Sequence, residues 1–511
     1  MEIAHIFISF YKIAVIFLYI MSCFYSRGNN MPKFVTPPEE VNWEELIEMD
    51  KKYFLRPIST AKEYSPLPIA RAEGAYLITS ENIKILDFMS VLHCANAGAY
   101  HPKIAQAIKE YADHFGYLYE GGFLEQMRPK VCKFLIEEAF KGDMARVGFG
   151  NSGSEAVEYA LMIARVYTGK PYVVTRWYDY HGWTAGAVAN TIIPYLRDLA
   201  IKPTKPGEVP EIKTPVGGIV PYTAIAPPPH CYRCPLGHTY PDCKDRKGML
   251  ACINILKELI LAHQPYVAAV ITEIVQGSCG VFAPPPEYNP QLRQITKELG
   301  VLWIDDEVIC GFGRTGPWFG YQNWDIKPDI VTFAKGVTGS HIPVGGVAIS
   351  PELAKWFDER KWWHASTFAS HPLGMAAAYA ALTVYKEEKL IPDHAKKIGK
   401  RLEEGLKGIQ DRHKSVGNVS GMGLIWGIEL VKNKETKEPI FPQDRFYFWH
   451  EEGVKIPSKV VAVKCIERRL LVSTFAANNI TLMPPLVVTE DEVDRAIDIL
   501  DKAIEEVDKM I

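Results

Sequence analysis

Two short apolar runs near the middle of the chain, each followed closely by a charged residue, most constrain its fold. Residues 301–305 (VLWID) and 329–333 (DIVTF) are bounded by charge, Gly and Pro, so both are predicted to be buried strands. Helical patterns alternate with such strands from residue 249 onward, which predicts a mostly parallel sheet with covering helices. Asp306 follows the first run and Lys335 the second. Because ligands bind beyond the carboxyl ends of such strands, the two side chains are predicted to face one pocket.

A lysine and an acid in one pocket indicate a particular cofactor, pyridoxal phosphate (PLP). PLP needs a lysine amine to form a Schiff base, and a carboxylate at its ring nitrogen keeps the ring protonated and electron-withdrawing. The alternative is that Asp306 and Lys335 are ordinary surface residues near strand ends. Spacing alone leaves both interpretations open.

A second segment, residues 146–169, predicts a phosphate site. A short strand breaks at Gly148 and Gly150, and a helix is expected to begin between Ser152 and Glu155. The free N–H groups at a helix N-terminus suit a phosphate, since glycine at 153 allows close approach and a serine follows it. The same letters also form an ordinary helix cap.

Several strings resemble those of the class III (ω-amino acid) aminotransferases of PLP fold type I. They are DEVICGFGRTG at Asp306 with AKG at residues 334–336, GNSGSEA at Gly150, YHG at Tyr180, TFASHP at Thr367 and MPPLVVTEDEVD at Met483. They stand in the family's order and span about residue 31 to the C-terminus. The resemblance implies a large α/β domain with a mostly parallel seven-stranded-type sheet between helices, and a smaller α+β domain. It also implies a ping-pong transaminase that moves an amino group from an ω-amino acid or amine to pyruvate or 2-oxoglutarate.

The resemblance also implies the site residues. Lys335 and Asp306 are expected to be the catalytic pair. Cofactor contacts are expected from this pair and from Gly153, Ser154, Tyr180, Glu273, Val308 and Thr367. In the family, the tyrosine stacks on the ring, the valine covers the opposite ring face, and the threonine reaches the phosphate of the neighbouring subunit. A homodimer or higher homo-oligomer with shared sites is therefore expected.

Departures from the family pattern concern the substrate. Trp183 stands where 4-aminobutyrate-type members often hold arginine, and residues 473–481 lack the arginine that commonly binds an α-carboxylate. We therefore expect an amine or ω-amino donor held by apolar and aromatic contacts, with Trp183 and Trp363 as candidates, or by another arginine such as Arg128. Residues 92–94 are expected to shape the substrate entrance, with the histidine as a packing residue.

Other activities remain open from the sequence. Amino-acid racemases and decarboxylases of the same fold use the same lysine and carboxylate. An alternative from another class is a non-catalytic interaction protein that keeps the fold.

Composition narrows the partners. The chain has 48% hydrophobic and 23% charged residues, which is ordinary for a globular protein. Its net charge of −3 argues against nucleic-acid binding. Ten cysteines indicate reduced intracellular thiols, and hence a cytoplasmic protein. Four of them, Cys231, Cys234, Cys243 and Cys252, have spacing that leaves a zinc or iron–sulfur site open, although we predict no metal.

The expected domain boundaries follow from these patterns. Residues 1–30 form an apolar extension that we interpret as a misplaced start rather than a membrane anchor, and no later segment is apolar for long enough to span a bilayer. Residues 31–99 are expected to be the N-terminal part of the small domain. The large PLP-binding domain is expected at 100–365, with a Pro-rich insertion at 203–245, and the C-terminal small domain at 366–511.

Overall fold

The computed structural model describes residues 35–55, 64–193, 222–442 and 455–511. The chain divides into two compact units, residues 1–71 with 79–82 and residues 72–78 with 83–511. In the first unit, the described residues form the 3-10 helix η2 (Pro38–Glu40) and the helix α2 (Trp43–Tyr53). Strand β1 (Ile69–Glu73) spans the boundary between the units. The predicted extension of residues 1–30 lies outside the described residues, and its interpretation stays a prediction.

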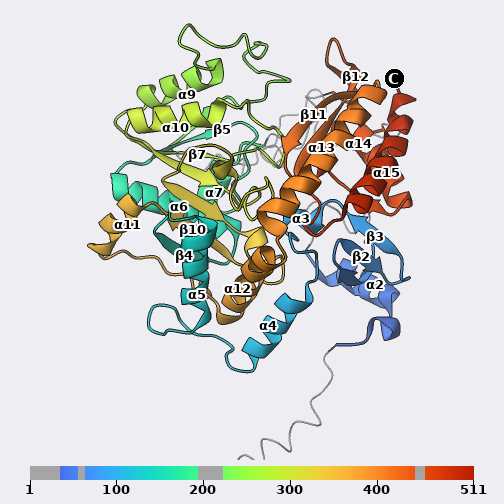
Figure 1. Cartoon of the computed structure of the whole chain (residues 1–511), viewed down its shortest axis with the longest axis horizontal. Helices are drawn as coiled ribbons and strands as arrows, with labels where there is room; N and C mark the ends of the chain where they lie inside the picture. The colour runs from blue at the N-terminus through green and yellow to red at the C-terminus, as the bar shows by residue number, and fades with distance from the viewer. Residues whose placement is uncertain (1–34, 56–63, 194–221, 443–454) are drawn as a thin grey trace, which may run out of the picture. The chain divides into compact units, whose positions relative to one another are not determined.

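A seven-stranded sheet forms the centre of the second unit (Figure 1). Its order is β4-β10-β9-β8-β7-β5-β6. β10 runs antiparallel to both of its neighbours, and the other adjacent pairs are parallel. The strands are β4 (Arg146–Gly150), β5 (Tyr172–Arg176), β6 (Thr223–Ala226), β7 (Val267–Thr272), β8 (Leu302–Asp306), β9 (Ile330–Phe333) and β10 (Gly345–Ile349). The predicted mostly parallel α/β sheet is confirmed.

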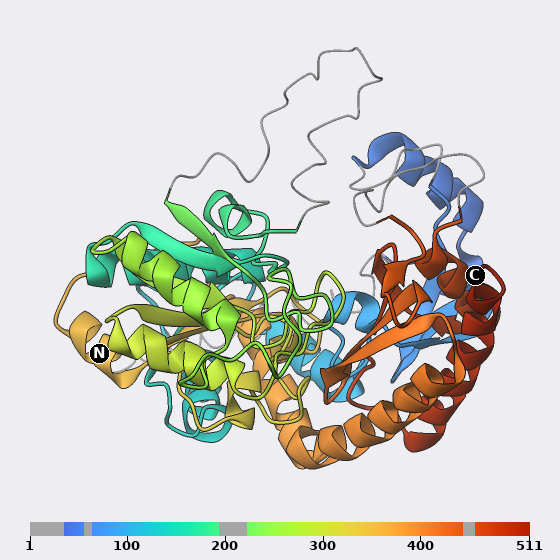
Figure 2. The same ribbon diagram turned by 90° about the horizontal axis from the view of Figure 1, so that it is seen from above.

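Alternating residues of the central strands face two helix layers. In β8, Trp303 belongs to one apolar core and Ile304 to another. The core around Ile304 includes buried residues of α6 (Gly153–Thr168), while the core around Trp303 includes residues of α9 (Ala251–Ala262) and α10 (Tyr288–Glu298). Figure 2 shows α6 and the pair α9 and α10 on opposite faces of the sheet. Because both faces are covered, the strands are apolar throughout rather than alternating.

One strand lies inside the predicted insertion. β6 pairs in parallel with β5, from Val173↔Thr223 to Arg176↔Ala226, so residues 223–226 belong to the main sheet rather than to an added loop. This edge strand has a single partner and four residues, and the prolines on its C-terminal side hide its periodicity. Residues 203–221 lie outside the described residues.

Two smaller sheets complete the second unit. One has the order β11-β12-β16-β15, with β13 paired to β12, and β14 pairs in parallel with β3 in another. α13 packs on β11 and on α15, and α14 packs on α15 (Figure 2). These elements are β2 (Tyr76–Thr79), β3 (Lys84–Asp87), β11 (Val416–Met422), β12 (Ile425–Asn433), β13 (Glu438–Pro439), β14 (Leu470–Leu471), β15 (Ser473–Ala476), β16 (Asn479–Leu482), α13 (Ala395–Arg412), α14 (Pro457–Glu467) and α15 (Glu490–Asp508). The boundary predicted near residue 366 falls within this unit and stays a prediction.

Short helices connect these layers. They are α3 (Ser90–His93), α4 (Pro102–Ala112), α5 (Met127–Phe134), η3 (Leu135–Ala139), α7 (Ala185–Ala189), η6 (Gly320–Asn323), η7 (Lys335–Thr338), α11 (Pro351–Asp358), α12 (Pro372–Glu387) and η8 (Leu390–His394). No helix among the described residues is both long and apolar enough to cross a bilayer.

Candidate active site

The predicted catalytic residues, Asp306 and Lys335, lie at the ends of two neighbouring parallel strands, β8 and β9. Asp306 is the last residue of β8 and lies opposite Thr332 of β9. Lys335 follows β9 after one further residue, with a left-handed φ of 45°. A lysine held in this sparsely populated region of backbone space is typical of a functional position. Both residues therefore lie at the carboxyl edge of the sheet, as predicted.

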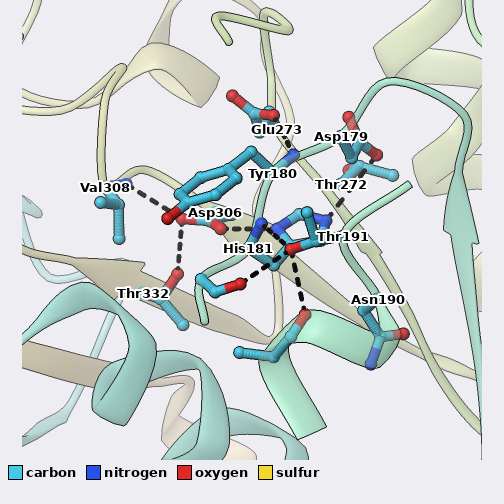
Figure 3. Close-up of polar contacts among 12 residues, drawn as sticks. Asp179, Tyr180, His181, Asn190, Thr191, Thr272, Glu273, Asp306, Val308 and Thr332 are labelled. Atoms are coloured by element: carbon cyan, nitrogen blue, oxygen red, sulfur yellow. Dashed lines mark hydrogen bonds and ion pairs between the residues drawn. The ribbon is translucent and has the colours of Figure 1, made fainter. Parts of the chain in front are cut away.

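Three hydrogen bonds fix the Asp306 carboxylate, which is 2% exposed. Its Oδ1 accepts from the Thr332 hydroxyl at 2.9 Å and from the Val308 backbone N–H at 3.1 Å. Its Oδ2 lies 2.6 Å from Nδ1 of His181 (Figure 3). The carboxylate is thus held in one orientation before any ligand binds.

His181 lies between two acids. Besides the contact to Asp306, its Nε2 lies 3.8 Å from Oδ2 of Asp179. Burial alone would lower the pKa of His181, but the interactions with Asp179 and Asp306 raise it to about 10. The two acids therefore favour the protonated, cationic form of the imidazole.

A further buried layer supports this pair. Arg176 binds Asp179 through two hydrogen bonds of 2.9 Å, and Gln276 donates a third at 2.8 Å. Glu273, just beyond β7, accepts from the backbone N–H groups of Tyr180 at 2.9 Å and residue 277 at 3.0 Å. Burial, followed by the charge of Asp179, raises the pKa of Glu273 to about 8.

The N-terminus of α6 lies beside the same strands. Ser152 caps the helix, since its hydroxyl accepts from the Glu155 N–H at 3.2 Å. A Cβ placed on Gly153 would lie 2.9 Å from Cγ1 of Val308 and 3.6 Å from Cβ of Ala334, the residue before the lysine. The Ser154 hydroxyl accepts from the Trp183 N–H at 3.0 Å. The predicted helix start is confirmed. The N–H groups of a first helical turn have no partner within the helix, and here they lie near Ala334, which suits a phosphate.

The lysine itself is half-buried and has no hydrogen bond or ion pair with the described part of the chain. Burial lowers the pKa of Lys335, while the charges of Asp306 and Glu273 act in the opposite direction. A buried amine with a lowered proton affinity is suited to act as a nucleophile and base.

Tyr180 and Val308 reach this region from two loops. Figure 3 shows the tyrosine ring close to the Asp306 carboxylate, with Val308 on the segment that follows β8. Tyr180 is half-buried and belongs to a small apolar cluster with Ile193, Cys279 and Phe282. An aromatic and an aliphatic side chain beside one carboxylate are what a flat heteroaromatic ring requires.

The residues present fit PLP. At Gly153 a side chain would collide with Val308, so the glycine leaves room for a phosphate to approach the backbone. A fixed carboxylate and a lysine with no partner among the described residues complete the site. The fold and the site together define a PLP-dependent enzyme of fold type I.

Comparison with known proteins gives the family. The model of aminotransferase class-III matches residues 58–504. The chain is 39% identical to an S-selective transaminase from Arthrobacter sp. solved with alanine bound, with a TM-score of 0.84 over 92% of this chain and 99% of that one. It is 31% identical over 451 residues to putrescine–pyruvate aminotransferase of Pseudomonas aeruginosa (86% of this chain, 90% of the relative). It is 29% identical over 472 residues to leucine/methionine racemase of Thermococcus litoralis (91% and 96%).

The chain belongs to the class-III aminotransferase family. It is a PLP-dependent enzyme that transfers an amino group to a 2-oxo acid. The alternative of a non-catalytic protein that keeps the fold is therefore wrong.

Thr367 follows Ser366, whose hydroxyl donates to Glu155 in the first turn of α6 at 2.9 Å. It is exposed, and its backbone carbonyl accepts a hydrogen bond from the Tyr117 hydroxyl. Arg128, considered as a substrate anchor, donates to the carbonyls of Glu120 at 3.2 Å and Phe123 at 3.0 Å. Its guanidinium therefore orders a loop, and this contact explains its presence without a substrate.

One of the predicted entrance residues, His93, lies in a strained turn. Ser90, Val91 and His93 all have positive φ values of 48–60°. The imidazole of His93 is buried and packs edge-on against Phe475 at 6.1 Å between ring centroids. This contact is the packing role expected from the sequence.

The four clustered cysteines line one small cavity together with His230 and His238. In the described ranges, no group of three or more His, Cys, Asp or Glu side chains is arranged to hold a metal ion. Every cysteine of those ranges is a free thiol.

Sequence reasoning assigned no role to Arg176, Asp179, His181 and Gln276, all of which are buried behind Asp306. The sequence did contain a signal, because charged and aromatic residues are interspersed in the string 176–181 (RWYDYH), which begins at the last residue of β5.

Proposed function

We propose that the enzyme takes a primary amine, in preference to an ω-amino acid, as donor and pyruvate as acceptor. The observation that carries the proposal is the position of Trp183. Its backbone binds Ser154 at the N-terminus of α6, and its side chain, 49% exposed, stands where an arginine would anchor a distal carboxylate. An indole contributes apolar contact and no positive charge.

Two relatives support pyruvate chemistry. One is named for putrescine and pyruvate, and another was solved with alanine, the amino acid that pyruvate becomes on amination. Ser473 and Thr481, where an arginine for an α-carboxylate is commonly found, are both buried. We infer that the acceptor's carboxylate is bound elsewhere and that the donor needs none.

The proposed roles follow from the geometry. PLP, when bound, withdraws electrons from the carbon that carries the amino group. The Lys335 amine is proposed to hold the cofactor covalently and, once released, to move a proton at that carbon. Asp306 is proposed to keep the proton on the ring nitrogen, Tyr180 and Val308 to clamp the ring, and Gly153 and Ser154 to bind the phosphate.

We also propose a homodimer. Thr367 lies on an exposed segment held by contacts from Tyr117 and, through Ser370, from Glu120. We propose that it completes the phosphate site of a neighbouring subunit. The cytoplasmic location likewise stays a prediction from the reduced cysteines.

A coupled assay tests the donor and acceptor. Putrescine, 1-phenylethylamine and 4-aminobutyrate are offered with pyruvate or 2-oxoglutarate, and alanine or glutamate is quantified. We expect alanine to form from the two amines faster than from 4-aminobutyrate. Preference for 4-aminobutyrate with 2-oxoglutarate would refute the proposal.

Racemase activity is a second candidate, because one relative is named a leucine/methionine racemase. The same assay separates the two reactions. A racemase inverts L-leucine with no 2-oxo acid present, whereas a transaminase consumes oxo acid in proportion to amine.

A further inference from the structure

Asp179 is a buried acid that the proposed roles do not use. It is fully buried, as are Arg176, His181 and Gln276 beside it. Figure 3 shows Asp179 on the side of His181 remote from Asp306. It therefore reaches the catalytic carboxylate through the imidazole.

Three hydrogen bonds fix the position of the Asp179 carboxylate. Both oxygens accept from Arg176 at 2.9 Å, and Oδ1 also accepts from Gln276 at 2.8 Å. The Arg176 side chain donates to the Glu273 carbonyl and lies over the Tyr288 ring, 5.5 Å from its centroid. These contacts hold one carboxylate oxygen 3.8 Å from Nε2 of His181.

His181 has an unsatisfied ring nitrogen that faces this acid. Nε2 is buried and forms no hydrogen bond with the described residues, while Nδ1 is bonded to Asp306. The backbone N–H of His181 donates to the Thr191 hydroxyl at 2.9 Å. This hydrogen bond fixes the backbone from which the imidazole extends. The distance from Nε2 to the Asp179 carboxylate is that of an ion pair rather than a hydrogen bond. A nearby negative charge stabilises a buried ring nitrogen in its protonated form.

We propose that Asp179 is a positioning residue that keeps His181 protonated, so that Asp306 remains an anion facing the cofactor's ring nitrogen. The inference rests on the proposed role of Asp306. Two acids, one arginine and one imidazolium give this buried group no net charge. Without Asp179, the positive charge of Arg176 would oppose protonation of His181. Asp306 would then be left as a buried anion without a cationic partner.

The other charged groups around His181 are consistent with this assignment. Asp306 contributes negative charge, whereas Glu273, with a pKa raised to about 8, is largely neutral near neutral pH. Burial lowers the pKa of Lys335. Arg176 is the cation nearest to Asp179 in the described part of the network. Asp179 therefore offsets this arginine from within the same buried group.

The test compares the affinities of the unloaded protein for PLP and for its 1-deaza analogue, in which carbon replaces the ring nitrogen. The ratio of the two dissociation constants, measured by absorbance titration, isolates the contact at the ring nitrogen because the phosphate and aldehyde are the same in both. We expect the unchanged chain to prefer PLP and Asp179→Asn to reduce that preference by about tenfold. General damage to the fold weakens both ligands and leaves the ratio unchanged.

Two further variants make the result decisive. Asp494→Asn, which breaks an exposed two-bond pair with Arg401, is the matched control and should keep the full preference. If Asp179→Asn does not fold because Arg176 is left unpaired, the double variant Arg176→Gln/Asp179→Asn removes both charges and should also lose preference. If either Asp179 variant prefers PLP over the 1-deaza analogue as strongly as the unchanged chain does, the role inferred for Asp179 is wrong, while the proposed role of Asp306 stands. The absence of any preference in the unchanged chain overturns the proposed role of Asp306 as well.

Discussion

Gly153 lies so close to Val308 that a single methyl group on the glycine would come within 2.9 Å of Cγ1 of the valine. This contact joins the N-terminus of α6 to the segment that follows β8. It therefore fixes the distance between the predicted phosphate site and the Asp306 carboxylate.

Gly153→Ala should weaken PLP binding. The added methyl must displace Val308 or tilt the start of α6, at a cost of about 1–3 kcal/mol. The dissociation constant of PLP, measured by absorbance, should rise by about tenfold or more. Gly116→Ala is the control, since a Cβ there meets no atom within 4 Å. Equal affinities for the two variants would argue against a close approach at 153.

Lys335→Ala should abolish the visible absorbance of the PLP-loaded enzyme and its reduction by borohydride. A visible band that survives in Lys335→Ala would place the covalent attachment at another lysine.

Asp306→Asn should retain the absorbance but lower kcat by about 10²–10⁴-fold, because an amide cannot keep the ring nitrogen protonated. Lys103→Ala, which removes an exposed lysine paired with Glu388, should change neither property.

Much of the fold was predictable because local patterns agreed with their tertiary setting. The runs that became β8 and β9 are apolar on both faces, as buried parallel strands must be. A capping box at Thr489 begins α15, since Thr489 and Glu492 each accept from the other's backbone N–H, and the threonine and glutamate three residues apart are a sequence signature of a helix start. β6 was missed because a four-residue edge strand gives little periodicity.

The residues of the site that could be predicted are those whose chemical type alone indicates their role. Asp306 ends β8 and Lys335 follows β9, and their residue types suit one cofactor. The role of Asp179 was not predictable, because it depends on the distances from its carboxylate to His181 and Arg176. Those distances are set by the irregular backbone after β5, which the sequence pattern does not reveal. The contact of Arg128 with two carbonyls was hidden for the same reason.

Stability of the unloaded protein should fall as pH rises from about 6.5 towards 10. The pKa of His181 is raised from 6.5 to about 10, so the native state keeps a proton that the unfolded chain releases in this interval. Native protein then binds more protons than unfolded protein, which makes the slope of stability against pH negative. Glu273, with a pKa raised to about 8, adds a decline in the lower part of the window.

The measurement is the unfolding midpoint in urea at several pH values, compared with that of His181→Asn. The variant should show a shallower decline, because it cannot take up the proton. Parallel slopes would show that His181 is neutral in the native protein.

Trp183→Arg should move donor preference towards 4-aminobutyrate. A guanidinium in place of the indole would offer two hydrogen bonds to a distal carboxylate. We expect kcat/KM for 4-aminobutyrate to rise by about tenfold relative to that for 1-phenylethylamine. Trp183→Phe, which keeps an apolar ring, should leave the ratio near its original value. An unchanged ratio in the arginine variant would place the donor's tail away from residue 183.

Mixing two inactive variants tests the shared site. Lys335→Ala lacks the attachment point, and Thr367→Ala lacks the proposed phosphate contact from the partner. If the threonine acts across the interface, a hybrid dimer contains one site with both residues intact, so subunit exchange at equal concentrations restores about one quarter of the sites. If Thr367 acted within its own subunit, no hybrid site would have both residues. PLP affinity and alanine formation, followed during exchange, would then stay at the level of the separate variants.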